Sequence, residues 1–218
     1  VVFTKNRVLF KDFSIFAGNS EFSLKGVIPK AENDSLTALF RDWELSNFDI
    51  ITKPMNIDFD GIINGSLDLS LKNDNPTLVS NINIKNLGLN KVYLGDASIL
   101  NTWDNSSNSI FIKSSIVRKG NAGEGEVFKA DGYYHPTKET DNLDIDVSFN
   151  RFKLKTFEPF LSAFVNDMEG TTSGDLSIRG SIKKPIITGN ADMQRAGMRV
   201  VYLNTKYSFS NSIDFVEN

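Results

Sequence analysis

Apolar and polar residues alternate strictly in several short stretches of this chain, and the alternation restricts the folds it can adopt. The clearest stretches are residues 66–72 (SLDLSLK), 81–85 (NINIK) and 143–149 (LDIDVSF). A period of two puts like side chains on one face of an extended strand, so each stretch predicts a strand that buries one face only. Clusters of Asn, Gly, Pro and Ser between the stretches are typical of hairpin turns. Because parallel sheets need crossover helices and strands apolar on both faces, the pattern predicts an all-β, antiparallel fold.

A long internal repeat sets the scale of the architecture. Gly61 and Gly170 are 109 residues apart, and so are Pro76 and Pro185. The same offset aligns further apolar residues and glycines: Phe40 with Phe149, Leu45 with Leu154, Phe48 with Phe157, Gly65 with Gly174, and Leu67 with Leu176. We therefore expect two copies of one unit, approximately residues 22–118 and 128–218. We also expect residues 1–218 to be one continuous segment of a longer protein.

Helix is predicted to be scarce. The strands that contain Phe40 and Phe149 are expected to end near those residues. One short helix is expected over residues 157–164, where Pro159 suits the first helical turn. The counterpart in the first copy, residues 48–54, is expected to be less helical.

Strands of this kind must bury their apolar faces by pairing two sheets, by closing a barrel or by curling into a trough. The alternation itself leaves these three possibilities open. The length of the repeat, and chain ends that fall inside a unit, favour the elongated, open arrangement.

The composition argues against several functions. A formal net charge of −3 and a pI of about 5.3 give no electrostatic footprint for nucleic acid. No cysteine is present, so disulfides, thiolate nucleophiles and cysteine-bound metals are excluded. The one histidine, His135, precedes Pro136 in a turn without evident catalytic partners. We therefore expect no enzymatic activity, no catalytic residue, no cofactor and no metal site.

The second copy carries a family resemblance. Residues 157–161 (FEPFL), 168–181 (MEGTTSGDLSIRGS) and 185–189 (PIITG) resemble the TamB C-terminal region of the AsmA-like superfamily. The resemblance is most specific over residues 143–201 and extends more weakly to residues 22–94. The first copy departs from it at Leu71 and Ser80, where the second has Gly180 and Gly189.

The resemblance implies an elongated antiparallel sheet curled into a half-pipe, a β-taco, with an apolar lumen and at most one or two short helices. It also implies a full-length protein anchored in the inner membrane and crossing the periplasm of a diderm bacterium. Proteins of this kind are implicated in phospholipid transport to the outer membrane. They also work with an outer-membrane barrel of the TamA type in outer-membrane protein assembly.

Three functions remain open from the sequence. The first is a hydrophobic groove that bridges the periplasm and holds phospholipid acyl chains. The second is a scaffold or chaperone that offers sheet edges to client strands, with a TamA-like barrel as partner. The third is a generic extracytoplasmic β-sandwich that binds a ligand on its surface.

The residues expected to line the groove are the apolar members of the alternating stretches. They are Phe22, Leu24, Leu67, Leu69, Leu71, Ile82, Ile84, Ile145, Val147, Phe149, Leu176, Ile178, Tyr207 and Phe209.

Overall fold

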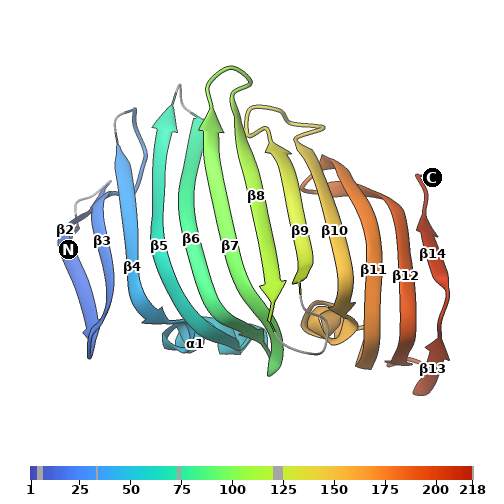
Figure 1. Cartoon of the computed structure of the whole chain (residues 1–218). Helices are drawn as coiled ribbons and strands as arrows, with labels where there is room; N and C mark the ends of the chain where they lie inside the picture. The colour runs from blue at the N-terminus through green and yellow to red at the C-terminus, as the bar shows by residue number, and fades with distance from the viewer. Residues whose placement is uncertain (4–6, 33, 73–74, 120–124, 218) are drawn as a thin grey trace.

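The computed structural model describes residues 1–3, 7–32, 34–72, 75–119 and 125–217, and these form one antiparallel sheet of fourteen strands. In chain order the strands are β1 (Val2–Phe3), β2 (Val8–Ala17), β3 (Ser20–Val27), β4 (Ser35–Glu44), β5 (Phe59–Lys72), β6 (Asn75–Leu89), β7 (Val92–Asp104), β8 (Ser109–Arg118), β9 (Gly125–Tyr134), β10 (Leu143–Lys153), β11 (Val165–Ser181), β12 (Lys184–Val200), β13 (Thr205–Phe209) and β14 (Ser212–Phe215). From β1 to β13 each strand pairs with the next one in the chain, and β14 also pairs with β12 (Figure 1). The sheet is not closed into a barrel. The predicted all-β, open and curled architecture is confirmed, whereas a sandwich of two packed sheets is wrong.

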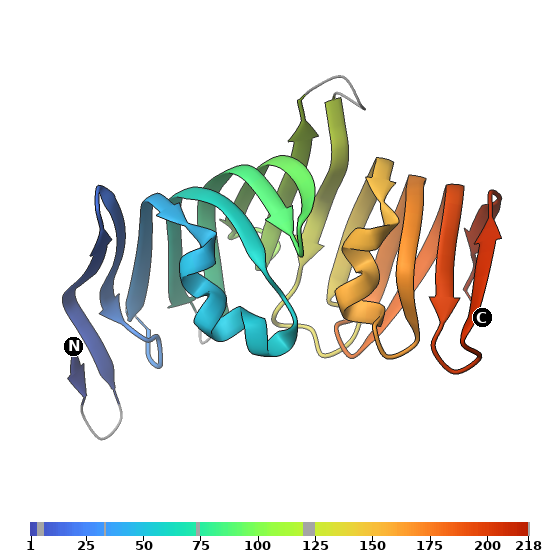
Figure 2. The same ribbon diagram turned by 90° about the horizontal axis from the view of Figure 1, so that it is seen from below.

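Two short helical segments interrupt the sheet. The first consists of η1 (Leu45–Phe48), α1 (Asp49–Thr52) and η2 (Lys53–Met55), and the second of η3 (Leu154–Phe157) and α2 (Glu158–Leu161). Both begin at matching positions of the repeat. Figure 1 shows them at the same edge of the sheet, and Figure 2 shows strands β5 to β7 arching over the first one.

The boundaries differ from those that the alternation predicts. β4 and β10 continue past Phe40 and Phe149, because a β-bulge in each strand, with positive φ at Asp42 and Arg151, restores the pairing. The second helical segment therefore starts and ends earlier than residues 157–164. The first, expected to be less helical, is helical from residue 45 to residue 55.

The strand register sorts side chains into an apolar face and a polar face. One row of directly paired residues crosses ten strands and is apolar or glycine throughout: Trp43, Ile63, Ile84, Ala97, Ile116, Phe128, Phe149, Gly174, Ala191 and Ile213. The row beside it, on the opposite face, is polar throughout: Asn64, Asn83, Ser98, Ser115, Lys129, Ser148, Asp175, Asn190 and Asp214. We call the face that carries the first row the lumen face. Both helical segments pack on it, inside the curve of the sheet.

Repeated glycines allow aromatic residues to lie on the lumen face. Gly65 pairs with Phe40, and Gly174 pairs with Phe149 at the matching position of the repeat. Gly65 has φ of +128°, and a Cβ atom placed there would lie 2.0 Å from the carbonyl oxygen of Asn81. The backbone of the neighbouring strand therefore occupies the space of a side chain.

We predict that Gly65→Ala lowers the free energy of unfolding by about 2–3 kcal/mol, because the backbone must move and the φ angle is strained. Urea unfolding followed by circular dichroism would measure this. Gly18→Ala is the matched control, since Gly18 also has positive φ but no atom lies within 4 Å of the added Cβ. It should lose only about 1 kcal/mol. Equal losses for the two variants would contradict the close-approach argument.

Candidate functional site

All fourteen residues expected to line a groove lie on the lumen face. Strand pairing places Phe22 and Leu24 of β3 on the same face as the expected residues of β5, β6, β10 and β11. Tyr207 and Phe209 lie on this face because they pair with Met198 and Ala196. Ile82, Ile84 and Val147 are buried, ten are half-buried, and Tyr207 is 44% exposed. The three buried residues serve packing, and the other eleven keep part of their apolar surface in contact with solvent. The lumen face is therefore an accessible apolar surface and not a sealed core.

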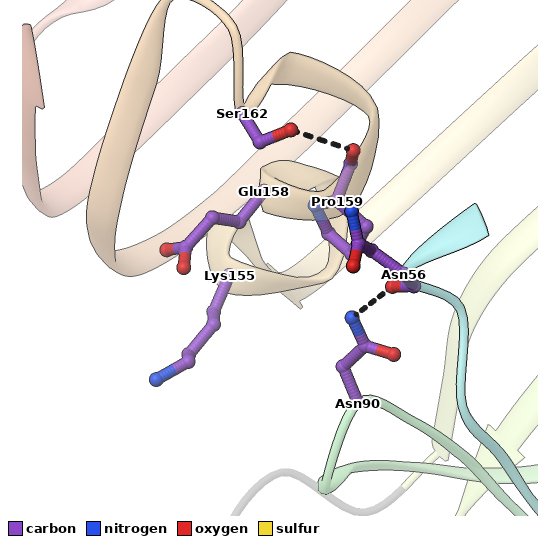
Figure 3. Close-up of a pocket in the computed structure, with 6 residues that line it drawn as sticks. All are labelled: Asn56, Asn90, Lys155, Glu158, Pro159 and Ser162. Atoms are coloured by element: carbon purple, nitrogen blue, oxygen red, sulfur yellow. Dashed lines mark hydrogen bonds between the residues drawn. The ribbon is translucent and has the colours of Figure 1, made fainter. Parts of the chain in front are cut away.

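A polar hollow lies between the two helical segments. It has a volume of about 190 Å³ and is lined by Asn56, Asn90, Lys155, Glu158, Pro159 and Ser162 (Figure 3). The Asn90 Nδ2 atom donates a hydrogen bond of 2.9 Å to the carbonyl oxygen of Asn56. The Glu158 carboxylate accepts one of 2.7 Å from the Met168 backbone amide. These groups fix the ends of the helical segments, so the hollow is best explained as a structural junction.

His135 has no cluster of metal-binding side chains around it among the described residues. Burial lowers the pKa of its imidazole, and Lys138 lowers it further. Its ring stacks on Tyr133 with centroids 6.3 Å apart. Among the described residues no three His, Cys, Asp or Glu side chains are grouped so that they could hold a metal ion.

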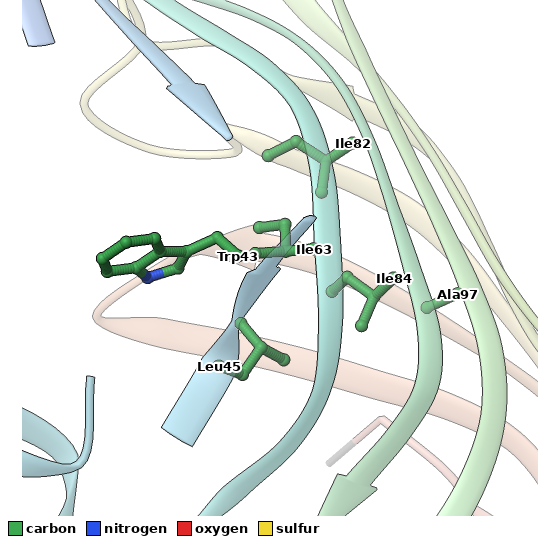
Figure 4. Packing of buried hydrophobic residues seen from close by; sticks show 6 residues of the cluster. All are labelled: Trp43, Leu45, Ile63, Ile82, Ile84 and Ala97. Atoms are coloured by element: carbon green, nitrogen blue, oxygen red, sulfur yellow. The ribbon is translucent and has the colours of Figure 1, made fainter. Parts of the chain in front are cut away.

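The first helical segment covers part of the lumen face in the first copy. Trp43, Leu45, Ile63, Ile82, Ile84 and Ala97 form a buried cluster there (Figure 4). Phe48 closes the cluster by contacting the rings of Phe22, Phe40 and Trp43 at centroid distances of 5.9, 6.2 and 6.3 Å. This region is packed protein core, so the accessible part of the face lies on either side of it.

An apolar hollow of about 250 Å³ opens on the lumen face of the second copy. Its lining consists of Phe149, Leu154, Phe157, Leu161, Met168, Thr172, Leu176, Ala191, Met193 and Phe215. Aliphatic and aromatic linings of this kind accept hydrocarbon ligands. This hollow is the part of the lumen face best shaped for an apolar ligand.

Sequence reasoning found Phe149 and Leu176 but missed the other residues of this hollow. Leu154 and Phe157 belong to the helical segment, and Met193 precedes a bulge at Arg195, where the strict alternation stops. The available signal was the apolar spacing around residues 154–161, which indicates a helix packed on the sheet.

One comparison with known protein families found a match. The family model that matches is the TamB C-terminal domain, over residues 118–218. Residues 118–218, 101 of the 218 residues of the chain, are therefore similar to the TamB C-terminal domain. The resemblance read from the sequence is thereby confirmed for this part of the chain. No curated protein and no solved structure matched the chain.

The match suggests a TamB-type role in the translocation and assembly module for residues 118–218. The first copy lies outside the matched residues, but it continues the sheet of the TamB domain without interruption through β8 and β9. In the described part of the chain, no helix has the length and apolar composition needed to span a bilayer.

We predict that Phe157→Ala destabilises the TamB domain by about 2–3 kcal/mol, somewhat below the range for a fully buried phenylalanine, since this side chain is half-buried. Its ring contacts Phe149 and Phe152 at centroid distances of 5.9 and 5.6 Å. Thermal unfolding monitored by circular dichroism would report the loss. Phe160→Ala, on the same segment but exposed, should change stability by less than about 0.5 kcal/mol. A large effect at Phe160 together with none at Phe157 would refute this packing.

Proposed function

We propose that the lumen face of this TamB segment holds the acyl chains of phospholipids that move between the inner and outer membranes. The observation that carries the proposal is the apolar row that runs across both copies. The other apolar side chains on the same face remain partly open to solvent. Each methylene group moved from water onto such a surface gains about 0.8 kcal/mol. Large exposed apolar patches on soluble proteins mark sites for a ligand or a partner.

The pairing of polar groups on the lumen face is compatible with the movement of acyl chains along it. Ser80 and Asn101 lie there in a paired position, and both are buried. The Asn101 Nδ2 atom donates a hydrogen bond of 2.8 Å to Ser80 Oγ, so these groups satisfy each other. Where donors and acceptors satisfy each other in this way, the surface offers an acyl chain no directional bond to break, and the barriers between neighbouring positions are small.

The proposed setting is a bridge across the periplasm of a diderm bacterium. In that setting the full-length protein is anchored in the inner membrane, and an outer-membrane barrel of the TamA type is the partner at the far end. The curled sheet supplies a continuous path, because every strand from β3 to β12 contributes apolar side chains to the same face.

We predict that a photo-crosslinking amino acid at Leu176 captures lipid in cells, because Leu176 lines the apolar hollow. The matched control is the adjacent Asp175, which is exposed on the polar face. Mass spectrometry of the purified adducts would identify the captured molecule.

Lipid at Leu176 and none at Asp175 supports the proposal. Polypeptide at Leu176 would replace it with a role as a scaffold or chaperone in outer-membrane protein assembly. Equal labelling at both positions would refute the assignment of the lumen face as a binding surface.

A further inference from the structure

One buried cation on the lumen face forms no ion pair with the described residues. Arg118 is the last residue of β8 and lies on the same face as Ile116, two residues earlier. Only 8% of its surface is exposed. Its Nε atom donates a hydrogen bond of 3.3 Å to the carbonyl oxygen of Leu94, whereas its buried Nη2 atom has no hydrogen-bond partner. Arg118 takes part in none of the ion pairs formed by the described residues.

Two further cations interact electrostatically with Arg118. Burial lowers the pKa of the Arg118 guanidinium and Arg151 lowers it further, whereas Tyr93 raises it. Burial also lowers the pKa of Lys153, and Arg118 adds to that effect. In the described part of the chain, Arg151 and Lys153 form no ion pair either. Of these three cations, Arg118 lies on the lumen face, whereas Lys153 pairs with Thr171 on the opposite face, in a hollow that Glu169 also lines.

The repeat indicates that the fold does not require Arg151 and Lys153. At the 109-residue offset, Arg151 matches Asp42 and Lys153 matches Glu44. The same bulge and the same strand end therefore form with acidic residues in the first copy. Backbone geometry therefore does not explain why positively charged residues occur at this junction.

The chemistry of the junction fits an anion attached to a hydrocarbon chain. An unpaired guanidinium is costly to bury, and its planar array of donors matches the oxygens of phosphate or carboxylate. Leu94, whose carbonyl oxygen binds Arg118, belongs to an apolar cluster with Val127 and Phe152. Charge and apolar surface therefore meet at the edge of the sheet where the helical segments also lie (Figure 1).

We propose that Arg118 binds the oxyanion of an acyl lipid whose hydrocarbon chain lies on the lumen face. The oxyanion is either the phosphate of a phospholipid or the carboxylate of a fatty acid. This inference rests on the proposed function and adds to it a fixed position for the headgroup. Nη2 of Arg118 then gains the acceptor that it lacks among the described residues.

The test uses the delipidated chain and three fluorescent probes with the same labelled acyl chain: phosphatidylglycerol, a free fatty acid and uncharged diacylglycerol. Titration gives the Kd of each probe for the unchanged protein and for Arg118→Met. Loss of a charge-assisted contact should weaken binding of the anionic probe about tenfold and leave diacylglycerol unchanged. A loss confined to phosphatidylglycerol assigns the phosphate, and a loss confined to the fatty acid assigns the carboxylate.

Three variants control the interpretation. Arg118→Lys keeps the charge and should retain part of the preference. Arg179→Met removes an arginine that pairs with Asp144 and Asp146 on the polar face, and it should bind all probes as before. Lys153→Ala removes a positive charge on the opposite face at the end of β10 and should weaken anionic binding by a smaller factor than Arg118→Met.

Unfolding temperature separates a binding role from a structural one. Because an unpaired buried cation destabilises a protein, lipid-free Arg118→Met should unfold at the same temperature as the unchanged chain or at a higher one. A clear decrease would mean that Arg118 is structural and would overturn the proposal. Unchanged affinity for every probe would overturn it while the groove function stands. No binding of any probe to the unchanged chain would refute both.

Discussion

The structure depends on covering an apolar face that has no second sheet opposite it. Most β proteins bury such a face against another layer, but here one open sheet carries the apolar rows of both copies. The helical segments cover only one edge, through the clusters around Trp43 and Leu154. Curvature brings neighbouring rows closer together without closing the surface. The part of the apolar face that the helical segments leave uncovered is available to an apolar ligand. The fold and the proposed function therefore both follow from the need to cover this face.

Each copy also completes the core of the copy before it. Val92 and Leu94, at the hairpin that ends β6, are 6% and 4% exposed because they pack with Phe152 of the second copy. The matching residues Val201 and Leu203 are identical in type but 43% and 53% exposed. The difference lies in what packs against the hairpin and not in the hairpin itself. Such an array grows by adding copies, and its apolar face lengthens with every addition.

The sequence predicted the strands that contain the alternating stretches and the face on which their side chains lie. Strict alternation at residues 143–149 determines which residues face the lumen, because the strand period is two. The prediction from alternation failed at Asp42 and Arg151, where a positive φ and an extra residue shift which side chains face the lumen. The lining from Leu154 and Met193 was missed for the same reason, since helical turns and bulges break a period of two. Burial of Ile82 beneath the first helical segment depends on tertiary packing, which the alternation does not encode.

A lumen face that was uniformly apolar would bind acyl chains without orienting them. Hydrocarbon contacts are non-directional, so a lipid could lie with its headgroup toward either edge of the sheet. Arg118 breaks this symmetry, because its guanidinium lies at the edge where β8 ends, and no comparable buried and unpaired cation is found on the rest of the described lumen face. An oxyanion held there would fix the direction of the acyl chain. The neighbouring exposed Arg151 would give the headgroup a second position on the solvent side. Several positions of moderate affinity suit a path along which a ligand must also leave, whereas a single tight site would stop it.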